Sequence, residues 1–120
     1  MKIAFTSSGK ELDSMLDLRF GRAAKFLIYD TETENIEIVS NTQNYNAVQG
    51  AGIQSAQNVA ETGAEILITG HSGPKAFIVL KAAHIKVYNC PKMSIKNALE
   101  QLKQNKLEEA KDADVEGHWI

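Results

Sequence analysis

The fold is decided by residues 66–88, which read ILITGHSGPKAFIVLKAAHIKVY. The first four residues are continuously apolar, as expected of a strand that is covered on both faces. A glycine-rich turn follows, and Pro74 then stands where the first position of a helix favours proline. The next segment has one apolar helical face, formed by Phe77, Val79, Leu80 and Ala83. Residues 85–88 are again β-prone, so the stretch predicts two parallel strands joined by a right-handed helical crossover.

The front of the chain predicts three more strands. Residues 3–5 are a short apolar run that ends at the polar loop 6–9, as in a buried strand. Residues 26–29 and 36–39 are both β-prone and flank the polar turn 30–35, a pattern typical of an antiparallel hairpin. We therefore expect an α/β fold with a mixed five-stranded sheet, an antiparallel front hairpin and helices on the faces of the sheet.

Two further helices complete the predicted order. Apolar residues recur at helical spacing along residues 48–60, and Gly63 stands where a C′ glycine would end that helix. Ser94 can cap a last helix. No repeat or low-complexity linker interrupts the pattern, so we expect one domain over residues 1–107 and a charged tail over residues 108–120.

Composition excludes several classes of function. Among 120 residues, 13 Lys and Arg stand against 15 Asp and Glu, a net charge of −2 that leaves no overall field to hold nucleic acid or an acidic membrane. No stretch approaches the roughly 20 apolar residues of a membrane span, and the apolar run at the N-terminus is too short for a signal peptide. The single cysteine, Cys90, excludes an intramolecular disulfide and a cysteine-only metal site. We expect a cytoplasmic protein with no nucleic-acid or membrane partner.

Two loops are expected at the edge of the sheet where α/β folds bind ligands, beyond the carboxyl ends of the strands. They are residues 6–9 and residues 70–74. The second loop leads into a helix, whose first N–H groups and partial positive charge suit an anion. Gly70 and Gly73 permit close approach of the backbone to a ligand, and Lys75 adds a cation. A tight turn in which glycine only supplies a positive φ explains the same residues equally well.

Two other segments are weaker candidates for an anion site. Gly50 and Gly52 open the long helix and offer a second helix N-terminus, although a glycine cap or close helix packing would need the same residues. Arg19 and Arg22 flank a Phe-Gly pair and could clamp a polyanion or a carboxylate. The alternative is a surface loop in which both arginines face the aspartates within residues 13–17.

Metal and catalytic motifs are sparse. The candidate metal ligands are His71, His84, His118 and Cys90. Their spacing matches no zinc motif, and His71 is the strongest because it lies in the glycine loop at the ligand edge. The first strand carries none of the carboxylates that a ribonuclease H-type nuclease needs for its two metal ions. Ser7 and Ser8 lack a nucleophile elbow. We therefore expect no enzyme.

Three blocks of sequence stand in order: residues 19–30, 50–57 and 68–88. Together they resemble the dinitrogenase iron-molybdenum cofactor family over most of residues 1–103. The resemblance implies a ribonuclease H-like fold without the nuclease acids. It also implies relatives that bind or carry iron-sulfur or molybdenum-iron-sulfur clusters during nitrogenase cofactor assembly, and another that holds a mixed molybdenum-copper sulfide cluster. Many other members are small stand-alone proteins, and this chain is similar to those.

The residue patterns and the resemblance together predict a site for an anionic cluster held by helix N-termini, basic side chains and one histidine. Its candidate residues are Arg19, Arg22, Gly50, Gly52, Gly70, His71, Gly73 and Lys75, with His71 as the candidate metal ligand. The predicted function is a non-catalytic binding or carrier protein for an anionic iron-sulfur or molybdenum-containing metal-sulfide cluster. A cluster-donor or acceptor protein would be its partner, and the chain would be a monomer or a weak homodimer. The alternative is a small regulatory or interaction module that binds a phosphate-type anion or a protein partner.

Overall fold

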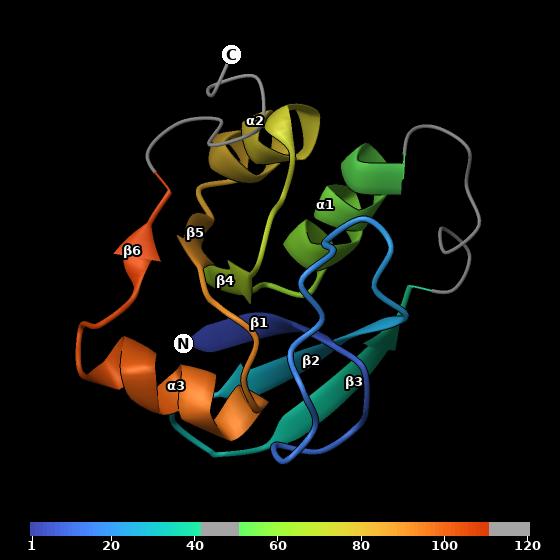
Figure 1. The fold of residues 1–120 in the computed structure, drawn as a ribbon. Coiled ribbons are helices and arrows are strands. Elements are labelled where there is room, and N and C mark those ends of the chain that lie inside the picture. The colour runs from blue at the N-terminus through green and yellow to red at the C-terminus, as the bar shows by residue number, and fades with distance from the viewer. Residues whose placement is uncertain (42–50, 111–120) are drawn as a thin grey trace.

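The computed structural model describes residues 1–41 and 51–110, and within these ranges it contains a mixed α/β fold (Figure 1). In chain order the elements are β1 (Lys2–Ser7), β2 (Lys25–Asp30), β3 (Ile36–Ser40), α1 (Ala51–Glu61), β4 (Ile66–Thr69), α2 (Pro74–Ala82), β5 (Lys86–Asn89), α3 (Ile95–Lys103) and β6 (Glu108–Glu109). The expected order of strands and helices is confirmed from β1 to α3. The stretch 66–88 is the predicted strand, helix and strand.

The strands of the described ranges form one sheet in the order β3-β2-β1-β4-β5-β6. β1, β4 and β5 are parallel to one another, while β2 is antiparallel to β1 and β3 is antiparallel to β2. The mixed sheet and its front hairpin are therefore as predicted. The order of the first five strands also agrees with the ribonuclease H-like architecture that we expected.

The prediction of five strands was wrong by one. Glu108 and Glu109, at the start of the expected tail, form β6 and pair antiparallel with Asn89 and Tyr88 of β5. The backbone N–H of Ala110 donates to the carbonyl of Val87 at 2.7 Å, which holds the end of this short strand against β5. Two exposed glutamates give no alternating pattern, so nothing in the sequence marked this strand.

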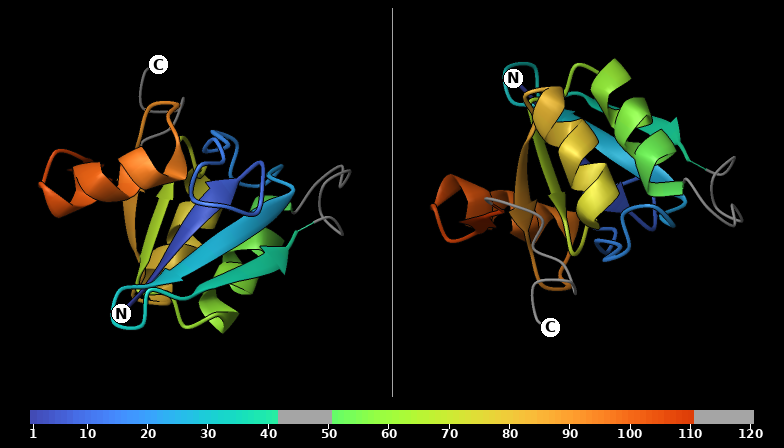
Figure 2. Two further views of the ribbon diagram at one scale, coloured as in Figure 1. Left: turned by 90° about the horizontal axis from the view of Figure 1, so that it is seen from below. Right: turned by 90° about the horizontal axis from the view of Figure 1, so that it is seen from above.

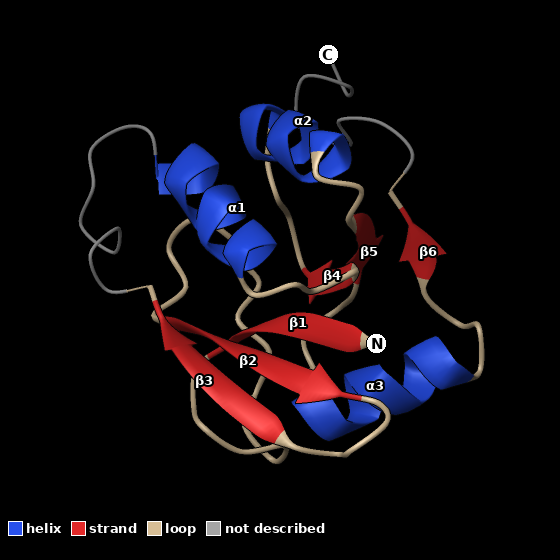
Figure 3. Ribbon diagram, turned by 180° about the vertical axis from the view of Figure 1, so that it is seen from behind, coloured by secondary structure: helices blue, strands red, loops and turns tan. Residues whose placement is uncertain are grey.

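Helices cover both faces of the sheet (Figure 2). α1 and α2 pack side by side on one face, and α3 lies on the other, as the view from behind also shows (Figure 3). Alternate residues of the strands point to opposite faces. The α1–α2 side includes the buried residues Ala4, Ile28, Leu67, Val59 and Phe77. The α3 side includes Ile3, Phe5, Leu27, Ile68 and Leu99. In the described ranges, none of the helices has the length and apolar character to cross a bilayer.

The helices begin and end where the capping residues in the sequence predict. Gly63 has a φ of 83° just beyond α1, and Pro74 is the first residue of α2. The Ser94 hydroxyl accepts a hydrogen bond from the Asn97 N–H at 3.1 Å and caps α3. Ala83 is exposed at the C-cap of α2 and does not belong to the buried face that we expected, because the helix ends at Ala82.

A buried asparagine ties the front loop to α1. Asn41 is 0% exposed, and its side-chain amide donates to the carbonyl of Ala23 at 2.9 Å. Its side-chain oxygen accepts from the Ser55 hydroxyl at 3.1 Å and from the Asn58 amide at 3.2 Å. These bonds fix α1 relative to the loop that contains the two arginines. Val48 and Gly50, which we expected at the start of this helix, lie outside the described residues.

Candidate functional site

The carboxyl ends of β1, β4 and β5 meet at one edge of the sheet because these strands are parallel. The segment between β1 and β2 crosses this edge and lies beside the loop between β4 and α2. The His71 N–H donates to the Leu18 carbonyl at 3.0 Å, and the Phe20 N–H donates to the His71 carbonyl at 3.2 Å. Phe20 is 1% exposed and packs its ring against Phe26, which anchors the segment in the core. The structure therefore places Arg19 next to His71.

Gly70 is required by this close approach. A Cβ at Gly70 would lie 2.6 Å from the Leu18 carbonyl oxygen and 2.7 Å from the Leu18 Cβ. The Asn89 amide donates to the Gly70 carbonyl at 2.8 Å and holds the loop from the other side. Gly70 also contributes to a hollow of about 280 Å³, which we name the Cys90 hollow. Its lining residues are Leu18, Gly70, His71, Asn89, Cys90 and Pro91.

A larger hollow of about 540 Å³, which we name the α1–α2 hollow, opens between the N-termini of α1 and α2. Its lining residues are Gly52, Ile53, Ser72, Gly73, Pro74, Lys75 and Ala76. A Cβ at Gly52 would lie 3.4 Å from the Ala76 Cβ, so the first turns of the two helices approach each other closely. The first N–H groups of a helix have no acceptor within the helix. Both helices therefore direct the partial positive charge of their N-termini toward this hollow.

The charges around the α1–α2 hollow favour an anion. The exposed Lys75 belongs to the first turn of α2, and neither α1 nor α2 has an acidic residue in its first turn. Gly73 has a φ of 84° and no neighbour within 4 Å of the position that a Cβ would occupy. The backbone beside Lys75 is therefore open to a ligand of several atoms.

The two arginines do not reach this hollow. Arg19 lines a third hollow of about 480 Å³, which we name the Arg19 hollow, together with Ser8, Met15, Leu16, Asp17, Leu18 and Lys92. Its guanidinium contacts the Asp17 carboxylate at 3.2 Å, with 63% of the Arg19 side chain exposed. Arg22 lies in the turn after Phe20 and is not among the residues that line these three hollows. Arg19 therefore faces Asp17, one of the two aspartates that the alternative interpretation placed opposite the arginines, and forms an ion pair with it.

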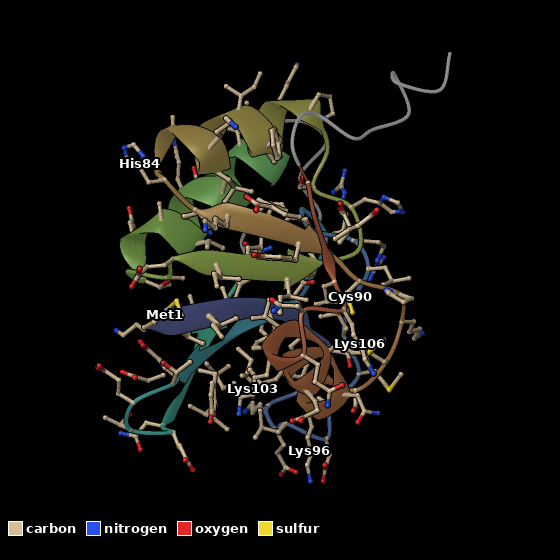
Figure 4. The ribbon with its side chains drawn as sticks, turned by 90° about the vertical axis from the view of Figure 1, so that its left-hand side faces the viewer. Met1, His84, Cys90, Lys96, Lys103 and Lys106 are labelled. Carbon is tan, nitrogen blue, oxygen red and sulfur yellow. The ribbon has the colours of Figure 1, made fainter. Side chains whose placement is uncertain are left out.

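The candidate metal ligands are spread over the molecule. His84 is exposed at one end of β5, and Cys90 lies beyond the other end near α3 (Figure 4). Cys90 is 4% exposed, and burial raises the pKa of its thiol, which disfavours the thiolate that a metal needs. His71 is exposed and shares the Cys90 hollow with this thiol. His118 lies outside the described residues. Within residues 1–41 and 51–110, no three His, Cys, Asp or Glu side chains gather as a metal site.

Comparison with known proteins agrees with the sequence blocks. The family model for the dinitrogenase iron-molybdenum cofactor matches residues 1–105. The chain belongs to this family. An uncharacterised protein of Methanocaldococcus jannaschii is 35% identical over 111 residues, which are 90% of each chain.

Two solved structures are similar to this member of the family in both sequence and fold. The apo form of the orange protein from Desulfovibrio gigas is 38% identical, with a TM-score of 0.91 over 95% of this chain and 96% of that chain. The solution structure of a Thermotoga protein provisionally named NifB is 40% identical, with a TM-score of 0.84 over 97% of this chain and 98% of that chain.

Five of the candidate residues line two adjoining hollows and do not form one cavity. Gly52, Gly73 and Lys75 line the α1–α2 hollow, and Gly70 and His71 line the Cys90 hollow. Gly50 lies outside the described residues. Sequence reasoning missed Ser72, which lines the α1–α2 hollow and is 7% exposed. Its place within the Gly-His-Ser-Gly loop was the available signal, but its burial depends on the packing of both helices.

Proposed function

We propose that this chain binds and carries an anionic metal-sulfide cluster, iron-sulfur or molybdenum-containing, and catalyses no reaction. The observation that carries the proposal is the convergence of two helix N-termini and Lys75 on the α1–α2 hollow. Each helix N-terminus carries roughly half a positive charge, and a cation beside two such ends favours an anion without thiolate ligands. At about 540 Å³ the hollow has the size of small-ligand sites.

Membership of the dinitrogenase iron-molybdenum cofactor family supports a cluster as the anion. The structure of the orange protein, a relative in this family, is described as an apo form. At the α1–α2 hollow and the adjoining Cys90 hollow, the described residues offer N–H groups, the Lys75 ammonium group and the exposed His71 imidazole, and they lack a set of thiolates. Such donors suit a preassembled cluster that is bound reversibly and passed on, with a cluster-donor or acceptor protein as the partner.

In this proposal His71 is the one candidate side-chain ligand to a metal. It precedes Ser72 in the chain but lines the neighbouring Cys90 hollow. Its imidazole is exposed, so a cluster at the rim of the α1–α2 hollow could exchange a terminal ligand for it. We assign Arg19 a secondary, electrostatic role because its guanidinium already pairs with Asp17.

The second candidate function is a module that binds a phosphate-type anion. The same helix N-termini and Lys75 would serve phosphate, and nothing in the donor set requires sulfide. The two functions differ in what the protein retains when it is purified.

Anaerobic purification followed by metal and sulfide analysis tests the proposal. We expect stoichiometric metal and sulfide with a visible absorption band, and at least a several-fold loss of both in Lys75→Ala, which removes the cation at the hollow. Lys103→Ala is the matched control, because it removes the same charge from the end of α3 on the other face of the sheet. A colourless protein that also takes up no supplied cluster would exclude the carrier function and leave the phosphate-type module.

A further inference from the structure

The hydroxyl of Ser72 is buried and has no hydrogen-bond partner. Ser72 is 7% exposed, and among the described residues its Oγ is the buried side-chain polar atom for which the structure offers neither donor nor acceptor. Buried hydroxyls are nearly always hydrogen-bonded, because burial without a partner forfeits their bonds to water. A buried hydroxyl left without a partner is therefore available for a hydrogen bond to a bound group.

The position of Ser72 points to that group. It lines the α1–α2 hollow directly before Gly73, the N-cap of α2, and its carbonyl lies 3.9 Å from where a Cβ of Gly52 would be. No side chain caps α2 at this end, so the hydroxyl is not used to satisfy the helix. Oriented into the hollow that Ser72 lines, this hydroxyl would add a donor to the N–H groups of the two first turns and to Lys75.

We propose that Ser72 is an anion-binding residue whose hydroxyl donates to a terminal oxygen or sulfur atom of the anion in the α1–α2 hollow. The inference rests on the proposed function for its site and extends it to a residue and a ligand class. Every polar side chain on the lining can donate a hydrogen bond, and the first turns of α1 and α2 have no carboxylate to repel an acceptor. The ligand class is an anion with several terminal acceptor atoms, shared by tetrahedral oxyanions and metal-sulfide clusters.

The test uses the full chain as wild type, Ser72→Ala and Ser8→Ala. Ser8 is the matched control, because it is an exposed serine at the same sheet edge that lines the neighbouring Arg19 hollow. Each protein is titrated with inorganic phosphate while amide signals are followed by NMR, with chloride as the reference. In a second arm, each is titrated anaerobically with a synthetic anionic iron-sulfur cluster while visible absorption is recorded.

We expect Ser72→Ala to weaken binding by about tenfold or more, as expected when a hydrogen bond to a charged acceptor is lost. Ser8→Ala should stay within about twofold of wild type. Without ligand, Ser72→Ala should melt at the wild-type temperature or above it, since it removes a buried hydroxyl that had no partner. Lower affinity with unchanged or higher stability is a combination that a merely structural serine would not give.

The phosphate titration and the cluster titration together distinguish a failure of the Ser72 proposal from a failure of the carrier function. If Ser72→Ala binds both anions as tightly as wild type, the role of Ser72 is refuted while the carrier function stands. If wild type binds phosphate through Ser72 but not the cluster, Ser72 is confirmed and the carrier function fails. If wild type binds neither anion, both are refuted. Ser72→Gly removes the same hydroxyl without introducing a metal ligand, and it replaces the alanine variant if that protein does not fold.

Discussion

Gly70→Ala tests whether the site is built by the close approach of two loops. The added Cβ would lie 2.6 to 2.8 Å from three atoms of Leu18, two of them backbone atoms that cannot rotate away. The segment at Leu18 would have to shift away from Gly70. Two backbone hydrogen bonds oppose this shift, because the His71 N–H donates to the Leu18 carbonyl and the Phe20 N–H donates to the His71 carbonyl. The substitution therefore acts on the junction that places Arg19 beside His71.

The cost of Gly70→Ala follows from these contacts. Overpacking a close-packed site costs about 1–3 kcal/mol. Weakening two backbone hydrogen bonds costs about 1–3 kcal/mol more. The two costs do not add in full, because a shift that weakens the hydrogen bonds also relieves the clash. We expect the free energy of unfolding to fall by about 2–4 kcal/mol, which lowers the melting temperature by roughly 10 °C in a domain of this size. Urea unfolding and thermal melting measure both quantities.

Two other glycines are the controls. Gly63→Ala meets no atom within 4 Å, and its cost comes only from the φ of 83°, about 1–2 kcal/mol. Gly52→Ala makes an ordinary contact with Ala76, so stability should change by less than about 0.5 kcal/mol or improve, while its methyl group narrows the α1–α2 hollow and weakens anion binding. If Gly70→Ala costs no more than Gly63→Ala, the account of this junction is wrong.

Three further predictions concern the rest of the fold. Asn41→Ala removes a buried side chain together with its hydrogen bonds to Ala23, Ser55 and Asn58, and chemical denaturation should show a loss of about 2–4 kcal/mol. Ser94→Ala removes the cap of α3 and should cost about 1 kcal/mol in the same assay, whereas an equal cost for both variants would contradict the buried network. Burial raises the pKa of the Cys90 thiol, so the folded protein should react with a thiol reagent more slowly than the unfolded protein at about pH 7, and faster as the pH rises. Equal rates in the folded and unfolded proteins would contradict its burial.

The part of the fold that sequence predicts well is the part with regular patterns. The continuous apolar run of β4, the Gly-Pro start of α2 and the β-prone runs around the polar turn 30–35 all have strong local causes. β6 has none, because Glu108 and Glu109 pair through their backbones and carry exposed charged side chains. Strand pairing of this kind depends on where the chain returns after α3, which no local pattern contains.

The candidate site was predicted less completely than the fold. Sequence located the loop 70–74 at the ligand edge, but it could not say which way each of its side chains faces. His71 makes a strand-like bridge with Arg19, and neighbouring side chains on extended backbone point in opposite directions. His71 and Ser72 therefore line different hollows. The burial of the Ser72 hydroxyl without a partner depends on tertiary packing that no local sequence pattern contains.

Our central proposal is that the α1–α2 hollow is the binding site of an anionic metal-sulfide cluster. The most direct measurement is the amide NMR spectrum of the protein before and after anaerobic loading with a stoichiometric amount of a synthetic anionic iron-sulfur cluster. The account predicts that the amide signals of residues 52–53, 72–73 and 75–76 shift or broaden first and most strongly. Saturable loading that instead perturbs mainly the Arg19 hollow or the turn at Arg22, and leaves both helix N-termini unchanged, would contradict it.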